Sequence, residues 1–286
     1  MKECTQNSFD FEPHFSRRVT AEFDGGTLTT DGGGLLLRQT ERRIGLLKRL
    51  RDCFLDGRRA SRVEHRLEEM LAQRIYGLAL GYEDLNDHEQ LRHDPLLGVL
   101  AGKKNLQRRL AGKSTLNRLE LTPEDDARQQ RYHKILYSTQ AIDELLVSVF
   151  LEAHRRPPRR IVLDLDATGT PLHGHQESRF FHGYYNHYCY LPLYIFCGGH
   201  LLRARLRPSN IDASAGSLEE VRTLVAQIRA RWPKTQIILR ADSGFCRDEL
   251  MSWCEDNRVD YVFGFARNER LRALIDEQMR QALTEH

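Results

Sequence analysis

The amino-acid sequence predicts an α/β protein with a mainly helical first part and a second part in which strands and helices alternate. Apolar residues recur at helical spacing, close to 3.6 positions, in the stretches up to residue 154. From Ile161 onward, short runs rich in β-branched residues replace that pattern. Pro157 and Pro158 stop the last helix of the first part. They are the predicted domain boundary, with residues 1–156 before it and residues 159–286 after it.

In the first part, helices are expected within residues 35–80 and over residues 139–154. One apolar set runs from Leu35 to Leu50 and another from Val63 to Leu80, both at helical spacing. Glycines at positions 25–26 and 32–34 are turn signals ahead of the first helix.

The sequence of the second part predicts three strands followed by alternating helices and strands. Gly198 and Gly199 are a hairpin signal, and Ser217 with Glu220 has the spacing of a helix capping box. Strands are expected over residues 161–166, 191–197, 201–206, 236–240 and 259–263, and helices over residues 218–231, 248–257 and 267–281. This order resembles the ribonuclease-H-like fold, by analogy with that fold family and not by derivation.

Composition leaves the class of partner open. The chain has 286 residues and a formal net charge of +3, which does not by itself identify a nucleic-acid binder. Basic residues cluster in the first part, and such clusters either neutralise DNA phosphates or are solvated helix faces. No apolar run approaches the roughly 20 residues of a membrane span, so we expect no membrane and a cytoplasmic location. The six cysteines form no C-x-x-C pair and are expected to be reduced.

Two aspartates follow strands that should be neighbours in the sheet. Asp166 ends the first predicted strand, and Asp242 comes just after the fourth. Because ligands of open α/β sheets gather at the carboxyl ends of strands, the two carboxylates are expected to converge there and hold Mg²⁺ or Mn²⁺. Asp164 competes with Asp166, since residues two apart on a strand share a face, and Asp166 is preferred for its place at the strand end. The alternative role for such loop aspartates is turn formation.

The segment between the first two strands of the second part contains several potential ligands. A zinc site could be formed by His173, His175, His182, His187 and Cys189. Their spacing matches no recognised pattern of zinc ligands, so a polar loop is the preferred interpretation. Aromatic residues at positions 180, 181, 184 and 185, next to Arg179, either stack on unpaired bases or pack beneath the sheet.

The short motifs of two other enzyme classes are incomplete or absent in this sequence. The run from Gly112 to Thr115 ends like a Walker A loop, but Gln107 stands where its first glycine should be. A G-x-S-x-G nucleophile elbow is absent from the sequence, which leaves a serine hydrolase unsupported.

Longer blocks resemble the group-1 DDE transposases of bacterial insertion sequences. The resemblance covers nearly the whole chain. Its strongest blocks are P-L-H-G at residues 171–174, F-F-H-G-Y-Y at 180–185, R-P-S-N at 207–210 and L-R-A-D-S-G-F at 239–245. A departure is Gly169-Thr170, where relatives tend to carry an acidic residue after the D-A-T segment.

The resemblance implies a metal-dependent enzyme that cleaves transposon ends and joins them to target DNA by phosphoryl transfer. Asp166 and Asp242 match the first two catalytic, metal-binding carboxylates of the family. The third, a glutamate on a later helix, has no match in this sequence, so the core is expected to lack its final helix and to be truncated at the C-terminus. Residues 1–156 would bind double-stranded DNA, transposon ends and target, as a homodimer. The alternative is a catalytically dead transposase that only binds DNA or inhibits a relative; whether the chain is an active enzyme stays open on the sequence.

Overall fold

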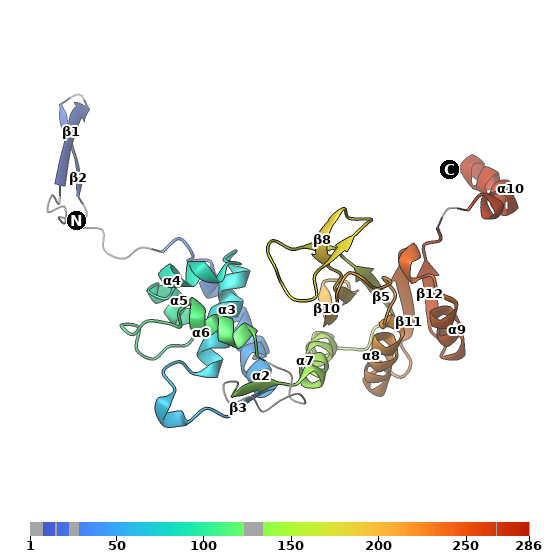
Figure 1. The fold of residues 1–286 in the computed structure, drawn as a ribbon, viewed down its shortest axis with the longest axis horizontal. Helices are drawn as coiled ribbons and strands as arrows, with labels where there is room; N and C mark the ends of the chain where they lie inside the picture. The colour runs from blue at the N-terminus through green and yellow to red at the C-terminus, as the bar shows by residue number, and fades with distance from the viewer. Residues whose placement is uncertain (1–7, 15, 23–28, 123–133, 267, 286) are drawn as a thin grey trace. The chain divides into compact units, whose positions relative to one another are not determined.

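The structure is a computed structural model that describes residues 8–14, 16–22, 29–122, 134–266 and 268–285 (Figure 1). The chain divides into two compact units, Met1–Thr139 and Gln140–His286. The division falls at the start of helix α7 (Thr139–Glu152) and not at the double proline. Helix α7 belongs with the second unit because its Val147 and Phe150 lie in the same buried cluster as the strands that follow.

The first unit is mainly helical, as predicted. The expected helical stretch over residues 35–80 is interrupted, since Phe54 pairs with Tyr137, far along the chain. The helices are α1 (Gly34–Ile44), α2 (Leu46–Asp52), α3 (Leu67–Ala79), α4 (His88–Leu91), α5 (Pro95–Leu100) and α6 (Lys113–Glu120), with the 3₁₀ turns η1 (Ala60–Arg62) and η2 (Leu85–Asp87). The strands are β1 (Ser8–His14), β2 (Arg17–Glu22), β3 (Phe54–Asp56) and β4 (Ile135–Tyr137).

Helix α3 forms the centre of this unit and contributes to two buried apolar clusters. Its Ala72 and Tyr76 pack with residues of α2 and α5, whereas Met70 and Leu71 pack with residues of α6. Between the clusters, the fully buried Gln73 donates to the carbonyl of Ala111 at 2.8 Å and accepts from its amide at 3.0 Å. These two hydrogen bonds satisfy buried polar groups, which would lower the stability of the fold if they had no partners. Helix α3 is thereby tied to the start of α6.

The second unit has a five-stranded mixed sheet in the order β10-β9-β5-β11-β12. Strand β9 is antiparallel to both of its neighbours, and β11 is parallel to β5 and to β12. Its strands are β5 (Arg160–Ala167), β9 (Leu193–Cys197), β10 (His200–Arg205), β11 (Gln236–Ala241) and β12 (Asp260–Phe263), and its later helices are α8 (Ser217–Arg231), α9 (Asp248–Asp256) and α10 (Glu269–Glu285), with the 3₁₀ turn η3 (Ser243–Phe245). Each strand and helix predicted here is present, in the predicted order, and the fold is ribonuclease-H-like.

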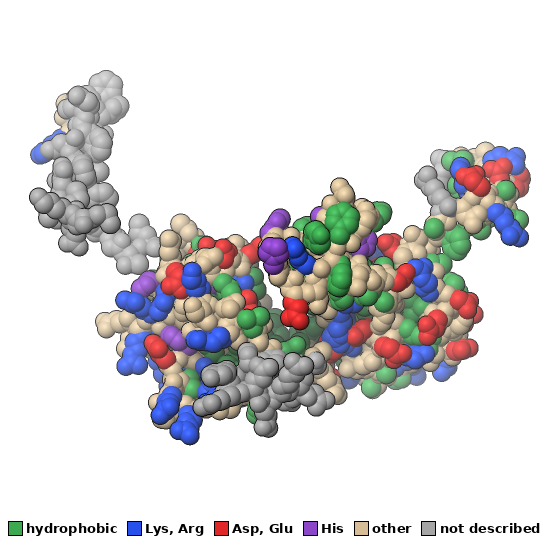
Figure 2. Space-filling view, in the orientation of Figure 1, with side chains coloured by type: hydrophobic (Ala, Val, Ile, Leu, Met, Phe, Trp, Pro, Cys, Tyr) green, Lys and Arg blue, Asp and Glu red, His purple; other side chains and the backbone are tan. Residues whose placement is uncertain are grey.

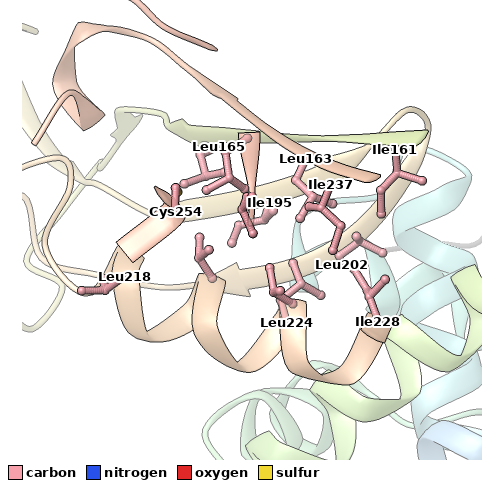
Figure 3. Packing of buried hydrophobic residues seen from close by; sticks show 14 of the residues in the cluster. Ile161, Leu163, Leu165, Ile195, Leu202, Leu218, Leu224, Ile228, Ile237 and Cys254 are labelled. Carbon is pink, nitrogen blue, oxygen red and sulfur yellow. The ribbon is translucent and has the colours of Figure 1, made fainter. Parts of the chain in front are cut away.

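One face of this sheet is covered and the other is partly open. Alternate residues of β5, namely Ile161, Leu163 and Leu165, are buried and lie against the apolar side of α8 (Figure 3). Burial of such aliphatic side chains contributes roughly 1.5–3 kcal/mol each. The intervening residues Asp164 and Asp166 therefore lie on the opposite face, because successive strand side chains alternate. That alternation decides where the candidate site lies.

Two sequence predictions are corrected. The segment after β5 is not simply a polar loop: β6 (Thr170–Pro171), β7 (Phe180–His182) and β8 (His187–Tyr190) form a small sheet in the order β6-β8-β7. Ser217 is not the cap of α8, because the helix begins at Ser217 and its cap is Gly216, with φ at 73°. The Glu220 side chain binds arginines of β10 instead.

The described segments of the chain contain no helix that is long and apolar enough to cross a membrane. Cys53, Cys189, Cys197, Cys246 and Cys254 are free cysteines in the structure, and Cys4 lies outside the described residues.

Candidate active site

Asp166 and Asp242 lie beside one another at the carboxyl edge of the sheet. Strands β5 and β11 are parallel, with Leu165 opposite Ala241, so the next residue along each chain is an aspartate. Neighbouring strands are about 4.8 Å apart, which brings the two backbones within reach of a shared ligand. Both aspartates are exposed to solvent. The convergence of these two carboxylates rests on strand register as well as on sequence spacing.

A local hydrogen bond orients each carboxylate. Oδ2 of Asp166 accepts from the Thr168 hydroxyl at 2.5 Å. Oδ1 of Asp242 accepts from the Gly244 amide at 2.8 Å and caps the turn η3. Within the described part of the chain, the second oxygen of each carboxylate has no hydrogen-bond partner and neither aspartate is in an ion pair. One oxygen of each group thus stays available to a ligand.

Asp164, the alternative to Asp166, has a different role in the structure. Its carboxylate forms a two-bonded ion pair with Arg240, with Oδ1 2.5 Å from Nε and Oδ2 3.0 Å from Nη2. Asp164 and Arg240 are direct partners in the register of β5 and β11. A carboxylate whose two oxygens both bind a guanidinium is a poor candidate for metal binding. Asp166 is therefore the better candidate, in agreement with its place at the strand end.

The backbone of Asp242 is closely packed against Gly264. A Cβ atom built on Gly264 would lie 2.9 Å from the Ser243 amide nitrogen and 3.2 Å from the Asp242 carbonyl carbon. The Gly264 amide also donates to the Ala241 carbonyl at 2.9 Å. Gly264 therefore fixes the path of the chain into the Asp242 turn, a role that the sequence pattern did not reveal.

A loop that follows β10 supports the same turn. Arg207 donates to the carbonyls of Leu191, Ala213 and Ala215, at 2.9, 3.1 and 2.6 Å. Burial lowers the pKa of this guanidinium from its ordinary value. Ala213 in turn lies against the position of a Cβ on Gly244, 3.3 Å away. The R-P-S-N block therefore shapes the loop that packs beside the Asp242 turn.

An ion pair closes this loop onto the segment after Asp242. Asp212 accepts from Arg247 at 2.7 Å and from the Ser214 hydroxyl at 2.6 Å. The hydrogen bond from Ser214, followed by that from Arg247, lowers the pKa of Asp212 to about 2. Asp212 stays ionised at neutral pH. It was not among the predicted site residues, because only the fold brings it near residue 247.

The histidines considered for zinc do not form a metal cluster. His182 and His187 are cross-strand partners in β7 and β8, and their rings lie 4.9 and 5.9 Å from the Tyr185 ring between centroids. Across the described ranges, no three His, Cys, Asp or Glu side chains are grouped as metal ligands. The zinc hypothesis thus has no support in the structure.

The first unit carries a basic hollow of about 410 Å³ lined by Arg58, Arg59, Arg62 and Lys134. Arg58 is held by two hydrogen bonds to Asp56, at 2.8 and 2.7 Å. Within the described segments, the other three cations have no ion pair. Lys134 joins the group because its carbonyl accepts from the Gly57 amide, 2.7 Å away, beside the paired strands β3 and β4.

Figure 2 shows further Lys and Arg side chains on the visible face of the first unit. Lys134 is distant in sequence from the three arginines, so the sequence alone did not reveal the complete group. Unpaired cations around a concave surface suit an anion such as a phosphate.

The donor set at Asp166 and Asp242 suits a hard divalent ion. Mg²⁺ and Mn²⁺ prefer oxygen ligands, and Mg²⁺ in particular keeps several waters and commonly binds one or two carboxylates. The exposed edge with one available oxygen on each aspartate matches that requirement.

Comparison with known proteins identifies the family. Residues 11–286 match the model of the family described as "Transposase DDE domain group 1". None of the curated protein sequences matches the chain. Among solved structures, the catalytic domain of Mos1 mariner transposase is similar at 12% identity and a TM-score of 0.28, over 51% of this chain and 71% of that one.

Two further solved structures are similar to this chain. A piggyBac transposase synaptic complex with hairpin DNA has 13% identity and a TM-score of 0.41, over 82% of this chain and 51% of that one. The Mos1 mariner paired end complex with Mn has 9% identity and a TM-score of 0.27, and the match covers 90% of this chain and 81% of that one. The family match spans nearly the whole sequence and includes both aspartates at the sheet edge, Asp166 and Asp242. The chain therefore belongs to group 1 of the transposase DDE domain family.

Proposed function

We propose that the chain cleaves DNA at the ends of an insertion sequence and joins the 3′-hydroxyl to target DNA, as a homodimer on the DNA. Asp166 and Asp242 are the catalytic residues and hold Mg²⁺ or Mn²⁺. The observation that carries this proposal is the register of β5 and β11, which puts the two aspartates side by side at the carboxyl edge. Each carboxylate also keeps one oxygen without a hydrogen-bond partner among the described residues.

The chain's own residues prepare the site for a phosphate and a metal. Thr168 and Gly244 each engage one oxygen, which restricts the rotation of both carboxylates. Two negative groups without a protein cation would repel a DNA phosphate unless a cation lies between them. Bound there, a divalent metal would activate the attacking oxygen and stabilise the charge on the leaving oxygen.

A cleavage assay with the cognate ends tests the proposal. The DNA flanking the gene supplies the end sequences, and labelled end duplexes are incubated with the full chain and Mn²⁺ or Mg²⁺. We expect a nick at the transposon end and a joined product on a denaturing gel, both abolished by a chelator. A chain that binds these ends and never nicks them, at any enzyme or metal concentration, would contradict the proposed catalysis.

A second candidate function is DNA binding without cleavage, including inhibition of an active relative. The observation that favours it is that, among the described residues, no third His, Cys, Asp or Glu joins Asp166 and Asp242 as a metal ligand. Losing one ligand of a metal site weakens or misplaces the ion. Under this function, Asp166→Ala leaves end binding and its salt dependence unchanged, and the wild-type chain is as inactive in cleavage as the variant.

The basic hollow of the first unit is proposed to contact the DNA backbone. We expect Arg59→Glu with Arg62→Glu to weaken duplex binding by at least about tenfold at moderate salt, because each removes a cation that neutralises a phosphate. The slope of log affinity against log salt should fall by about one for each phosphate that is no longer neutralised. Fluorescence anisotropy across a salt series measures both.

A double charge reversal of exposed residues in the second unit, Arg231→Glu with Lys234→Glu, is the matched control for nonspecific electrostatics, because it changes the net charge by the same amount. An equal loss in this control and in the double variant of the hollow would show that net charge, and not this hollow, sets the affinity.

Crowding at Gly264 is expected to impair cleavage more than folding. Gly264→Ala puts a methyl group 2.9 Å from the Ser243 nitrogen and 3.2 Å from the Asp242 carbonyl carbon, and backbone atoms can yield only by moving Asp242. We expect a fall in cleavage rate of about 10–100-fold, since small displacements of a reacting group cost that much. Duplex binding should change little.

Gly199→Ala is the matched control, because a Cβ there meets nothing within 4 Å. Both variants are followed by cleavage rate and by thermal unfolding. Equal cleavage rates in the two variants would remove the positioning role given to Gly264.

A further inference from the structure

Four aromatic rings lie exposed on the small sheet that follows Asp166, and the least exposed of them is Phe180, at 40%. Tyr184 is 86% exposed, Phe181 54% and Tyr188 46%. Large apolar side chains grouped at a surface usually mark an interaction site. The sequence left two roles open for this segment, packing beneath the sheet or stacking on bases. Exposure of this extent excludes simple packing for these rings.

Each of the three most exposed rings contacts a neighbouring ring of the same small sheet, and the Tyr184 ring lies 5.1 Å from that of Tyr185 between centroids. Phe181 and Tyr188 are direct partners across β7 and β8, with ring centroids 5.7 Å apart in an edge-to-face arrangement. The guanidinium carbon of Arg179 lies 4.6 Å from the centroid of the Tyr188 ring. Arg179 is itself positioned by hydrogen bonds to the Gly174 carbonyl and to the His175 ring. Figure 2 shows hydrophobic, basic and histidine side chains close together over this part of the unit.

The chemistry of this surface suits nucleic-acid bases. Between residues 168 and 192 the only acidic residue is Glu177, whereas Arg179 and four histidines are present. Bases stack on aromatic rings and on guanidinium groups, and each stacked base contributes roughly 1–3 kcal/mol. A duplex hides the faces of its bases, so such a surface selects unpaired bases.

The small sheet is attached beside Asp166. The Tyr185 hydroxyl donates to the Ala167 carbonyl at 3.3 Å, one residue after Asp166. The Tyr185 ring also covers Gly169, where a Cβ would lie 2.7 Å from two of its ring carbons. This close approach leaves no room for a side chain at position 169 while the Tyr185 ring stays in place.

A second attachment comes from the loop beside the Asp242 turn. The Ser209 hydroxyl donates to the Phe180 carbonyl at 3.0 Å. The small sheet is thus attached both to the residue after Asp166 and to the loop that packs beside the Asp242 turn.

We propose that Phe181, Tyr184 and Tyr188 stack on unpaired bases of the DNA strand that adjoins the Asp166–Asp242 site. This inference rests on the proposed function, because it assigns a binding surface for the DNA that the site would cut. Bases next to a strand break have lost a stacking neighbour, so they cost less to take out of the duplex than internal bases. The surface would hold them apart from the duplex and fix the position of the reacting strand.

The test compares single-stranded with double-stranded DNA. The probes are a fluorescein-labelled oligothymidylate of about 15 nucleotides and a labelled duplex carrying the end sequence, titrated with the full chain at one fixed salt concentration. We expect Tyr184→Ala, and separately Phe181→Ala, to weaken oligothymidylate binding by about 5–150-fold and to leave duplex binding within about twofold. Thermal unfolding of each variant verifies that it folds.

Substitutions at position 184 separate stacking from general apolar contact. Tyr184→Phe keeps the ring and should bind oligothymidylate like the wild type, whereas Tyr184→Leu keeps an apolar side chain without a ring and should bind like Tyr184→Ala. Equal binding by Tyr184→Leu and Tyr184→Phe would overturn the stacking role.

The remaining outcomes distinguish a failure of this inference from a failure of the proposed function. If the wild type binds the duplex and the alanine variants bind oligothymidylate as tightly as it does, the inference fails and the proposed function stands. If the wild type binds neither probe, both fail. A change in the oligomeric state of Tyr184→Ala with oligothymidylate binding intact would assign the rings to contacts between copies of the chain and overturn the inference.

Discussion

Asp166→Asn and Asp242→Asn are each expected to lower the rate of DNA-end cleavage by about three orders of magnitude or more. Asparagine keeps the size of the side chain but removes the negative charge that would hold a divalent ion. The hydrogen bonds from Thr168 and from the Gly244 amide can still be accepted by the amide oxygen. The fold should therefore persist, and the loss should appear in cleavage alone. Single-turnover cleavage of labelled end DNA in Mn²⁺ measures the rate, and anisotropy measures binding.

The matched control is Asp164→Asn, two residues before Asp166 on the same face of β5. Asp164 is engaged by Arg240 through both of its oxygens, so its replacement should change cleavage by less than about tenfold. If Asp164→Asn abolished cleavage while Asp166→Asn retained it, the catalytic role would pass to Asp164. If all three variants cleaved like the wild type, the metal site would lie elsewhere in the protein.

The architecture of the second unit follows closely from local sequence patterns. Runs such as Ile161–Asp166 have alternating buried and partly exposed residues, and glycine pairs or Trp-Pro punctuate them. These signals act over a few residues, which is why strand and helix order could be predicted. The small sheet β6-β8-β7 could not, because its strands have two to four residues and its register depends on a turn at Asn186, whose φ is 56°. So short a strand leaves no periodic pattern.

The candidate site likewise has residues that the sequence predicts and residues that it does not predict. Asp166 and Asp242 were predicted because one lies at the end of a strand and the other directly follows a strand, which are local features. The residues that support them were not, since their roles arise from contacts between distant segments. Gly264 lies against the Asp242 backbone, and Arg247 pairs with Asp212. The basic hollow depends likewise on the pairing of β3 with β4, which brings Lys134 to the arginines of residues 58–62.

A buried network of ion pairs joins α7, β10 and α8 in the second unit. Arg203 is fully buried, with Nη1 2.8 Å from Oδ2 of Asp143 and Nε 3.1 Å from Oε2 of Glu220. Arg205 binds the same two carboxylates, and its hydrogen bond to Asp143 raises the pKa of the guanidinium. Two buried or half-buried cations thus depend on two carboxylates. The angles at Arg203 are poor for hydrogen bonds, so its attraction to both acids is mainly that of an ion pair.

Removing one of these carboxylates is expected to destabilise the protein strongly. In Asp143→Ala, Arg203 stays buried with one acid shared between two guanidiniums, and leaving a buried charge without its partner costs about 3–5 kcal/mol. Glu220→Ala should cost nearly as much. Glu219→Ala is the matched control on the same turn of α8, because Glu219 is 74% exposed in its pair with Arg222, and such a pair contributes at most about 1 kcal/mol. Urea unfolding followed by circular dichroism gives the three free energies. A destabilisation in Asp143→Ala no larger than in Glu219→Ala would mean that water reaches Arg203 and solvates it, so that the sheet and α7 are held together by their apolar contacts alone.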